Sequence, residues 1–138
     1  MMVGLLIITH DHVGTALYET AVQMLGMCPL MTEVLPVMAD CEPDAMVKRG
    51  RELVDKLNEG DGVLILTDMY GSTPSNIAAR LAVDHRVLVV SGINLPMLVR
   101  IMNYPKLGVM ELALKAESGG RDGIFYCVPE ILSDWRDT

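Results

Sequence analysis

The chain has 138 residues, and its 18 acidic side chains outnumber its 11 basic ones to give a net charge of -7. This length is typical of one domain and too short for an eight-stranded α/β barrel, which needs roughly 200 residues or more. No basic patch stands out, which argues against nucleic acid as a partner. Hydrophobic residues make up 51% of the chain but aromatic residues only 4%, so we expect an aliphatic core typical of a buried parallel sheet.

The cysteines and the N-terminus indicate the compartment. Cys28, Cys41 and Cys127 are widely spaced, without a C-x-x-C pair, which is typical of free thiols in a reducing cytoplasm. The first apolar run reaches only Ile8 before polar Thr9, so we expect neither a signal peptide nor a membrane span. A cytoplasmic protein that is not embedded in a membrane is therefore predicted.

Strand and helix patterns alternate through the first two thirds of the chain. Short apolar runs predict strands at Val3–Thr9, Thr32–Val37, Gly62–Thr67 and Arg86–Ser91. Pro36 in the second run favours an edge position. Helical patterns follow the first three strands at Val13–Gly26, Pro43–Asn58 and Pro74 to about Val83. The alternation predicts an α/β fold, doubly wound, with a mostly parallel sheet in the flavodoxin-like order 2-1-3-4 and helices on both faces.

The last third predicts further helices and a turn. Helices are expected at Asn94–Asn103 and Leu107–Ser118, then a turn-rich break at Gly119–Gly123. A short strand at Ile124–Val128 and a final helix at Pro129–Trp135 complete the chain. The segment Leu95–Met102 is apolar on nearly every side, so it is either buried within one chain or part of a dimer interface.

Ligands bind at the carboxyl ends of strands in such sheets, which directs attention to His10 and Asp68. His10 follows the first strand, where neutral imidazole could act as a nucleophile. Asp68 follows the third strand, and a carboxylate on one ring nitrogen would fix the tautomer and leave the other nitrogen free. The alternatives are a histidine satisfied by backbone groups and an aspartate that only serves a turn.

The segment from Gly71 to Asn76 (GSTPSN) is the third part of this prediction. Thr73 suits an N-cap and Pro74 a first helical position, so a well-made helix start is one interpretation. A glycine loop entering a helix also offers free N–H groups and a positive dipole end to an anion. Together with His10 and Asp68, the loop predicts a phosphohistidine site.

A metal site is the competing interpretation. His10, Asp11 and His12 form an H-x-H pattern, which occurs in metallohydrolases, but His85 is the one remaining histidine and is expected at the opposite end of the sheet. The sequence contains no G-x-G-x-x-G, Walker A or G-x-S-x-G motif. We therefore expect neither a metal nor another cofactor.

Three motifs together resemble the mannose-type enzyme IIA domain of the bacterial phosphoenolpyruvate:sugar phosphotransferase system (PTS). They are VGLLIITH ending at His10, GVLILTDMYGSTPSNIAAR from Gly62 to Arg80, and SGINLPML from Ser91 to Leu98. The resemblance covers about residues 2–126, and residues 1–138 are expected to form one such domain with a short tail at 127–138. It implies a homodimer, in which a late antiparallel strand is exchanged between the two sheets.

The resemblance also implies the roles of the site residues. His10 would accept a phosphoryl group from the phosphocarrier HPr and pass it to a IIB component, and Asp68 would orient His10. The implied phosphoryl contacts are Thr9 and Thr73, together with the backbone of Tyr70, Gly71, Ser72 and Thr73. The chain departs from the family at Asp11, where glycine is frequent, and at Gly71-Ser72-Thr73-Pro74, where Gly-Gly-Ser-Pro is usual. Two alternatives use the same histidine: a regulatory sensor of phosphorylation state, and the phosphotransfer subunit of a dihydroxyacetone kinase.

Overall fold

A four-stranded parallel sheet forms the centre of the molecule, with the order β2-β1-β3-β4. The computed structural model describes residues 2–136. The strands are β1 (Gly4–His10), β2 (Thr32–Val37), β3 (Val63–Thr67) and β4 (Val87–Ser91). Every neighbouring pair is parallel, and β2 lies at one edge. The predicted strand order and the edge position of the strand that contains Pro36 are confirmed.

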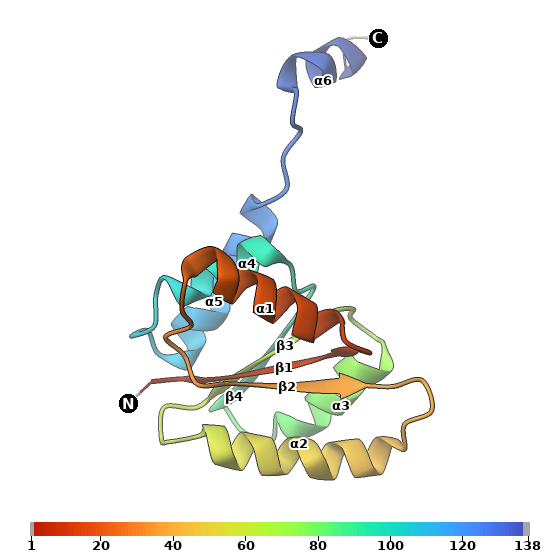
Figure 1. Cartoon of the computed structure of the whole chain (residues 1–138), viewed down its shortest axis with the longest axis vertical. Helices are drawn as coiled ribbons and strands as arrows, with labels where there is room; N and C mark the ends of the chain where they lie inside the picture. Colours follow the sequence, from red (N-terminus) through yellow and green to blue (C-terminus); the bar gives the residue numbers. More distant parts are fainter. Residues whose placement is uncertain (1, 137–138) are drawn as a thin grey trace.

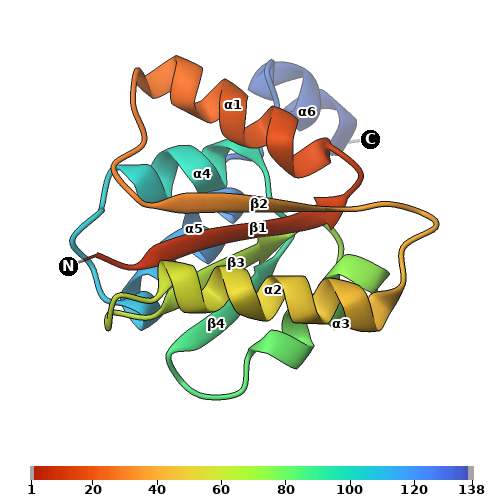
Figure 2. The ribbon, with the colours of Figure 1, turned by 60° about the horizontal axis from the view of Figure 1, so that its bottom comes forward.

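Helices cover both faces of this sheet (Figures 1 and 2). The helices are α1 (Val13–Leu25), α2 (Pro43–Leu57), α3 (Thr73–Leu81), α4 (Leu95–Met102), α5 (Val109–Asp122) and α6 (Pro129–Arg136). Helices α1, α4 and α5 share one hydrophobic core with the sheet, and α2 and α3 share the other. Alternate residues of β1 serve the two cores: Leu5 and Ile7 belong to one, Leu6 and Ile8 to the other. Both faces of the strand are therefore buried, which explains its unbroken apolar run.

Helix α4 is largely covered within the chain. Met97, Leu98, Ile101 and Met102 are buried, in the core that α1 and α5 also line. The side chain of Asn94 caps the helix by accepting from the Met97 N–H at 2.9 Å. Of the two expectations for this segment, burial within one chain therefore holds for its apolar face.

The predicted turn at Gly119–Gly123 is wrong, because α5 continues through Gly119 and Gly120 to Asp122 and ends at Gly123. A Cβ at Gly119 would lie 2.5 Å from Arg100 Cβ, and a Cβ at Gly123 would lie 2.3 Å from Pro96 Cβ. These glycines let α5 approach α4 closely, so they serve helix packing and not a change of chain direction.

The chain leaves the body of the molecule after Gly123. Residues 124–128 form no strand within residues 2–136, so the short strand predicted there is absent from the single chain. Helix α6 stands away from the other elements (Figure 1) and has no buried residues. We call residues 124–136 the C-terminal arm.

Candidate functional site

His10 marks the point where β1 leaves the core. Residues Gly4–Thr9 of this strand are buried, whereas His10 is exposed, and half of its side-chain surface (50%) is accessible to solvent. Because β1 lies between β2 and β3, the ends of both neighbours flank the imidazole. The imidazole is thereby held on a rigid element and is still open to solvent.

Asp68 follows β3 and binds His10 through a single carboxylate oxygen. Asp68 Oδ2 accepts a hydrogen bond from the His10 backbone N–H at 3.0 Å and lies 2.9 Å from His10 Nδ1. A carboxylate only accepts hydrogen bonds, so Nδ1 carries the proton in the neutral ring and Nε2 keeps a free lone pair. The carboxylate is only 17% exposed, which strengthens its interaction with a ring that becomes positively charged.

The loop after Asp68 turns into α3 beside this pair. Gly71 has a φ of +82°, a conformation that favours glycine. The Ser72 backbone N–H and hydroxyl both donate to the Met69 carbonyl, at 3.3 Å and 2.5 Å. Ser72, not Thr73, is the N-cap residue, and its side chain makes no capping hydrogen bond. The first-turn N–H groups of α3 therefore lack a side-chain acceptor and suit an anion.

The turn from β1 into α1 is built on Asp11 and Thr9. Asp11 has a φ of +45°, and its N–H donates to the Val37 carbonyl at 2.9 Å. Thr9 is fully buried, and its hydroxyl accepts from the Gly14 N–H at 2.7 Å. The side chain of Thr9 thus lies beneath the site and fixes the start of α1, whereas a direct phosphoryl contact would need it at the surface.

A small pocket of about 280 Å³ lies against His10. Its lining residues are His10, Asp11, Val37, Met38, Ala39, Cys41, Pro43 and Thr73. The pocket thus joins the end of β1, the loop after β2 and the start of α3. Thr73 and His10 therefore line the same pocket.

The comparisons with known proteins fit this geometry. The family model of the PTS system fructose IIA component, EIIA-man, matches residues 4–112. The chain belongs to this family. It is 30% identical over 129 residues to the PTS system mannose-specific EIIAB component of Escherichia coli K12, an alignment that covers 90% of this chain and 39% of that protein. The chain therefore spans about two fifths of the length of the curated relatives that it matches.

Solved structures share the fold of this IIA component. The mannose/sorbose specific IIA subunit from Enterococcus faecalis superposes with a TM-score of 0.82 at 20% identity, covering 93% of this chain and 96% of that one. The PTS IIA protein associated with the fucose utilization operon of Streptococcus pneumoniae gives 0.78 at 23% identity, covering 93% and 95%. At these identities the likeness concerns the fold. No helix within residues 2–136 has the length and apolar character to cross a membrane.

His12, the second histidine of the H-x-H pattern, lies next to Asp11 in this IIA component. His12 Nε2 lies 3.6 Å from Asp11 Oδ1, and both side chains are about two-thirds exposed. Within residues 2–136, no group of three potential metal ligands gathers. His85 is exposed in the turn between α3 and β4, at the other end of the sheet as expected.

Sequence reasoning missed an exposed apolar surface around the IIA site. Val13, Met38, Met69 and Tyr70 are exposed by 45%, 40%, 66% and 88%, and each lies in or beside a segment that follows β1, β2 or β3. We call these four residues the apolar rim. Its signal was visible in the sequence, because Met69 and Tyr70 are large apolar residues in a segment that otherwise reads as a polar turn.

A set of hydroxyls behind the IIA site was also missed. Thr67 Oγ1 lies 2.7 Å from Ser91 Oγ, and Ser75 Oγ lies 3.5 Å from the same atom. These contacts join the ends of β3 and β4 to the first turn of α3. They hold the start of α3 in place relative to the ends of β3 and β4.

Proposed function

We propose that this IIA component carries a phosphoryl group on His10 Nε2, which it accepts from HPr and passes to a IIB component in sugar uptake. The observation that carries the proposal is the contact between His10 Nδ1 and Asp68 Oδ2 at 2.9 Å. It selects the tautomer in which Nε2 is the nucleophile. The family membership, with the match over residues 4–112, supports phosphotransfer as the reaction.

The transfer proceeds by displacement at phosphorus. The Nε2 lone pair attacks the phosphoryl group on the donor histidine, the donor P–N bond breaks, and its electron pair returns to the donor ring. His10 then carries a positive charge shared over its ring, which the Asp68 carboxylate stabilises while it keeps the Nδ1 proton. The uncapped first turn of α3 provides N–H donors for the phosphoryl oxygens. Onward transfer is the reverse displacement on the acceptor's nucleophile.

The apolar rim supports a protein as the partner in both steps. Exposed apolar residues around a polar centre are typical of protein–protein contacts. The pocket beside His10, at about 280 Å³, is small for a site that encloses an organic substrate. Donor and acceptor histidines on folded partners need only approach the surface. The residues of the reaction would thus meet at a docked interface in the cytoplasm.

We further propose that the chain forms a homodimer through its C-terminal arm. Ile124, Phe125, Tyr126 and Trp135 of the arm are exposed by 62–80%. Strand β4 pairs only with β3 among the described strands, so its outer edge is open. An exposed apolar arm and an unpaired strand edge on one chain complement each other on two chains.

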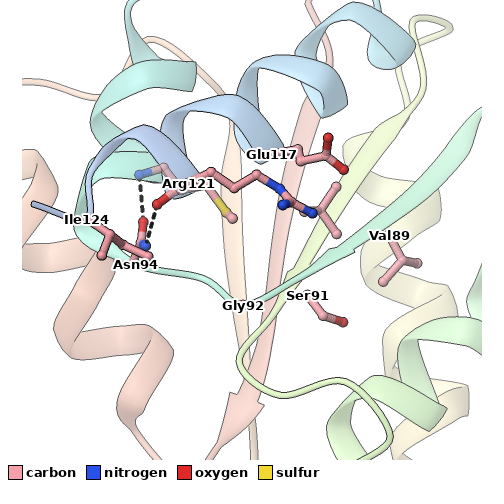
Figure 3. Close-up of a pocket in the computed structure, with 10 residues that line it drawn as sticks. Val89, Ser91, Gly92, Asn94, Glu117, Arg121 and Ile124 are labelled. Atoms are coloured by element: carbon pink, nitrogen blue, oxygen red, sulfur yellow. Dashed lines mark hydrogen bonds between the residues drawn. The ribbon is translucent and has the colours of Figure 1, made fainter. Parts of the chain in front are cut away.

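A pocket of about 430 Å³ lies beside the open edge of β4 (Figure 3). Val89 and Ser91 line it from the strand, Gly92 from the residue after the strand, and Glu117 and Arg121 from α5. Ile124, the first residue of the arm, lies at the same pocket. In a dimer, the arm of the second chain would cover this edge.

Incubation with phosphoenolpyruvate, enzyme I and HPr, followed by intact-mass measurement, tests the proposed function. A mass increase of one phosphoryl group that requires all three components is the expected result. Addition of a IIB component then separates the carrier from the sensor. Loss of the phosphoryl group to IIB supports transport, whereas retention supports the regulatory alternative.

A further inference from the structure

We propose that Asp11 weakens the hold of His10 on its phosphoryl group, so that this IIA component passes the group on more readily. The proposal rests on the proposed function, because it concerns the phosphorylated state of His10. Asp11 acts through its charge, which opposes the charge of the phosphoryl group across the site. It is thus a residue that tunes the transfer equilibrium and takes no part in bond making.

The backbone fixes Asp11 beside His10. Its φ of +45° and the hydrogen bond from its N–H to the Val37 carbonyl at 2.9 Å anchor the turn to the end of β2. Asp11 lines the same pocket as His10 and Thr73. A phosphoryl group between His10 and the start of α3 would therefore occupy a pocket that Asp11 also lines.

The backbone conformation does not require a carboxylate. Glycine, asparagine and aspartate all tolerate a positive φ. What aspartate adds over the other two is a negative charge. This charge opposes the anion that the proposed function requires the site to accept.

Within residues 2–136, neither a lysine nor an arginine forms an ion pair with Asp11. The residues that line the pocket include neither lysine nor arginine. The ion-pair partner that the structure gives Asp11 within residues 2–136 is His12, at 3.6 Å and 69% exposed. Asp68, the second carboxylate of the site, is already bound to His10 Nδ1. A phosphoryl group of about two negative charges thus faces Asp11 with only partial screening.

Repulsion raises the free energy of phosphorylated His10 relative to the free form. It lowers the equilibrium constant for loading and raises the constant for onward transfer by the same factor. Because Asp11 is 65% exposed, water and salt screen the interaction. We expect an effect of about 3- to 10-fold.

The test compares four full-length proteins: wild type, Asp11→Asn, Asp11→Gly and Asp55→Asn. Asp55 is exposed on α2, in the half of that helix that leads back to the start of β3, so Asp55→Asn makes the same charge change away from the site. Each protein is equilibrated with a mixture of phosphorylated and free HPr, and intact mass gives the phosphorylated fraction of both. The ratio is an equilibrium quantity, so a variant that only docks more slowly leaves it unchanged.

Asp11→Asn should increase the loading constant by about 3- to 10-fold, and Asp11→Gly should match it. The gain should shrink as sodium chloride rises from about 0.05 to 0.5 M, because salt screens exposed charges. Asp55→Asn should equal wild type. A wild type that is phosphorylated on His10 but has the same constant as Asp11→Asn would overturn this inference alone. A wild type that HPr does not phosphorylate would overturn the proposed function, and this inference with it.

Discussion

One oxygen of Asp68 holds His10 at two points: Oδ2 accepts from the His10 backbone N–H at 3.0 Å and lies 2.9 Å from ring Nδ1. The first contact fixes the main chain at the tip of β1 and the second fixes the ring. Position and tautomer of the imidazole therefore depend on one side chain at the tip of the neighbouring strand. The relationship follows from the adjacency of β1 and β3 in the sheet.

Asp68→Asn should preserve the fold and slow phosphoryl transfer. An amide can fill the space and accept one hydrogen bond, but it stabilises a positively charged, phosphorylated ring less than a carboxylate does. The equivalent change in a serine protease triad costs about 10⁴-fold. We expect a smaller loss, roughly 10- to 10³-fold, because the donor is already activated. Rapid-quench measurement of the transfer rate checks this, and an unchanged rate would reduce Asp68 to a turn residue.

Tyr70→Ala should weaken the docking of HPr and leave the equilibrium constant for phosphorylation of His10 unchanged. Tyr70 is 88% exposed, so its removal changes no core packing, and truncation of an aromatic residue at an interface commonly costs more than about 1 kcal/mol. The expected result is a KM for HPr raised by about fivefold or more, with the loading constant of His10 unchanged. Val83→Ala, at an apolar residue that is 75% exposed between α3 and β4, is the matched control. Equal KM values for Tyr70→Ala, Val83→Ala and wild type would remove Tyr70 from the docking surface.

Because α5 approaches α4 closely, one added methyl group at Gly119 should lower the free energy of unfolding substantially. Gly119→Ala should destabilise the chain by about 1–3 kcal/mol, because its Cβ would lie 2.5 Å from Arg100 Cβ. Gly108→Ala is the comparison without a steric clash, since nothing lies within 4 Å of a Cβ there, and it should cost only the preference of an N-cap for glycine over alanine. Urea unfolding of both variants gives the comparison. Equal stabilities would mean that the helices separate without cost.

The exposed apolar residues of the C-terminal arm predict a dimer that single substitutions can disrupt. Light scattering of the wild type at micromolar concentration should give about twice 15.1 kDa. Phe125→Asp should shift the mass toward 15.1 kDa without loss of monomer stability, because Phe125 is 80% exposed in the single chain. A wild type that stays monomeric at micromolar concentration would contradict the proposed exchange of a strand between two chains.

Local patterns in the sequence were sufficient to predict the strands of the sheet and the proximity of His10 and Asp68 at its carboxyl edge. Four apolar runs fixed the strands, and the carboxyl-edge rule for parallel sheets brought His10 and Asp68 together. The predictions failed where a distant neighbour decides the local structure. Gly119 and Gly120 read as a turn from their own sequence, and only their contacts with Arg100 and Met97 of α4 explain a helix there.

Thr9 illustrates a second limit of sequence reasoning. The resemblance implied a phosphoryl contact at Thr9, but Thr9 is the last buried residue of β1, and both faces of this strand are covered. The side chain of Thr9 therefore turns inward to bind the Gly14 N–H. The N-cap of α3 moved by one residue, from Thr73 to Ser72, which is within the usual uncertainty of helix ends.

The central claim is that His10, and not His12, carries the phosphoryl group. Wild type, His10→Ala and His12→Ala are each incubated with labelled phosphoenolpyruvate, enzyme I and HPr. Label should appear in the wild type and in His12→Ala, should be absent from His10→Ala, and should be lost in acid but kept in base, as expected for a phosphoramidate. Label retained in His10→Ala and lost in His12→Ala would contradict the account.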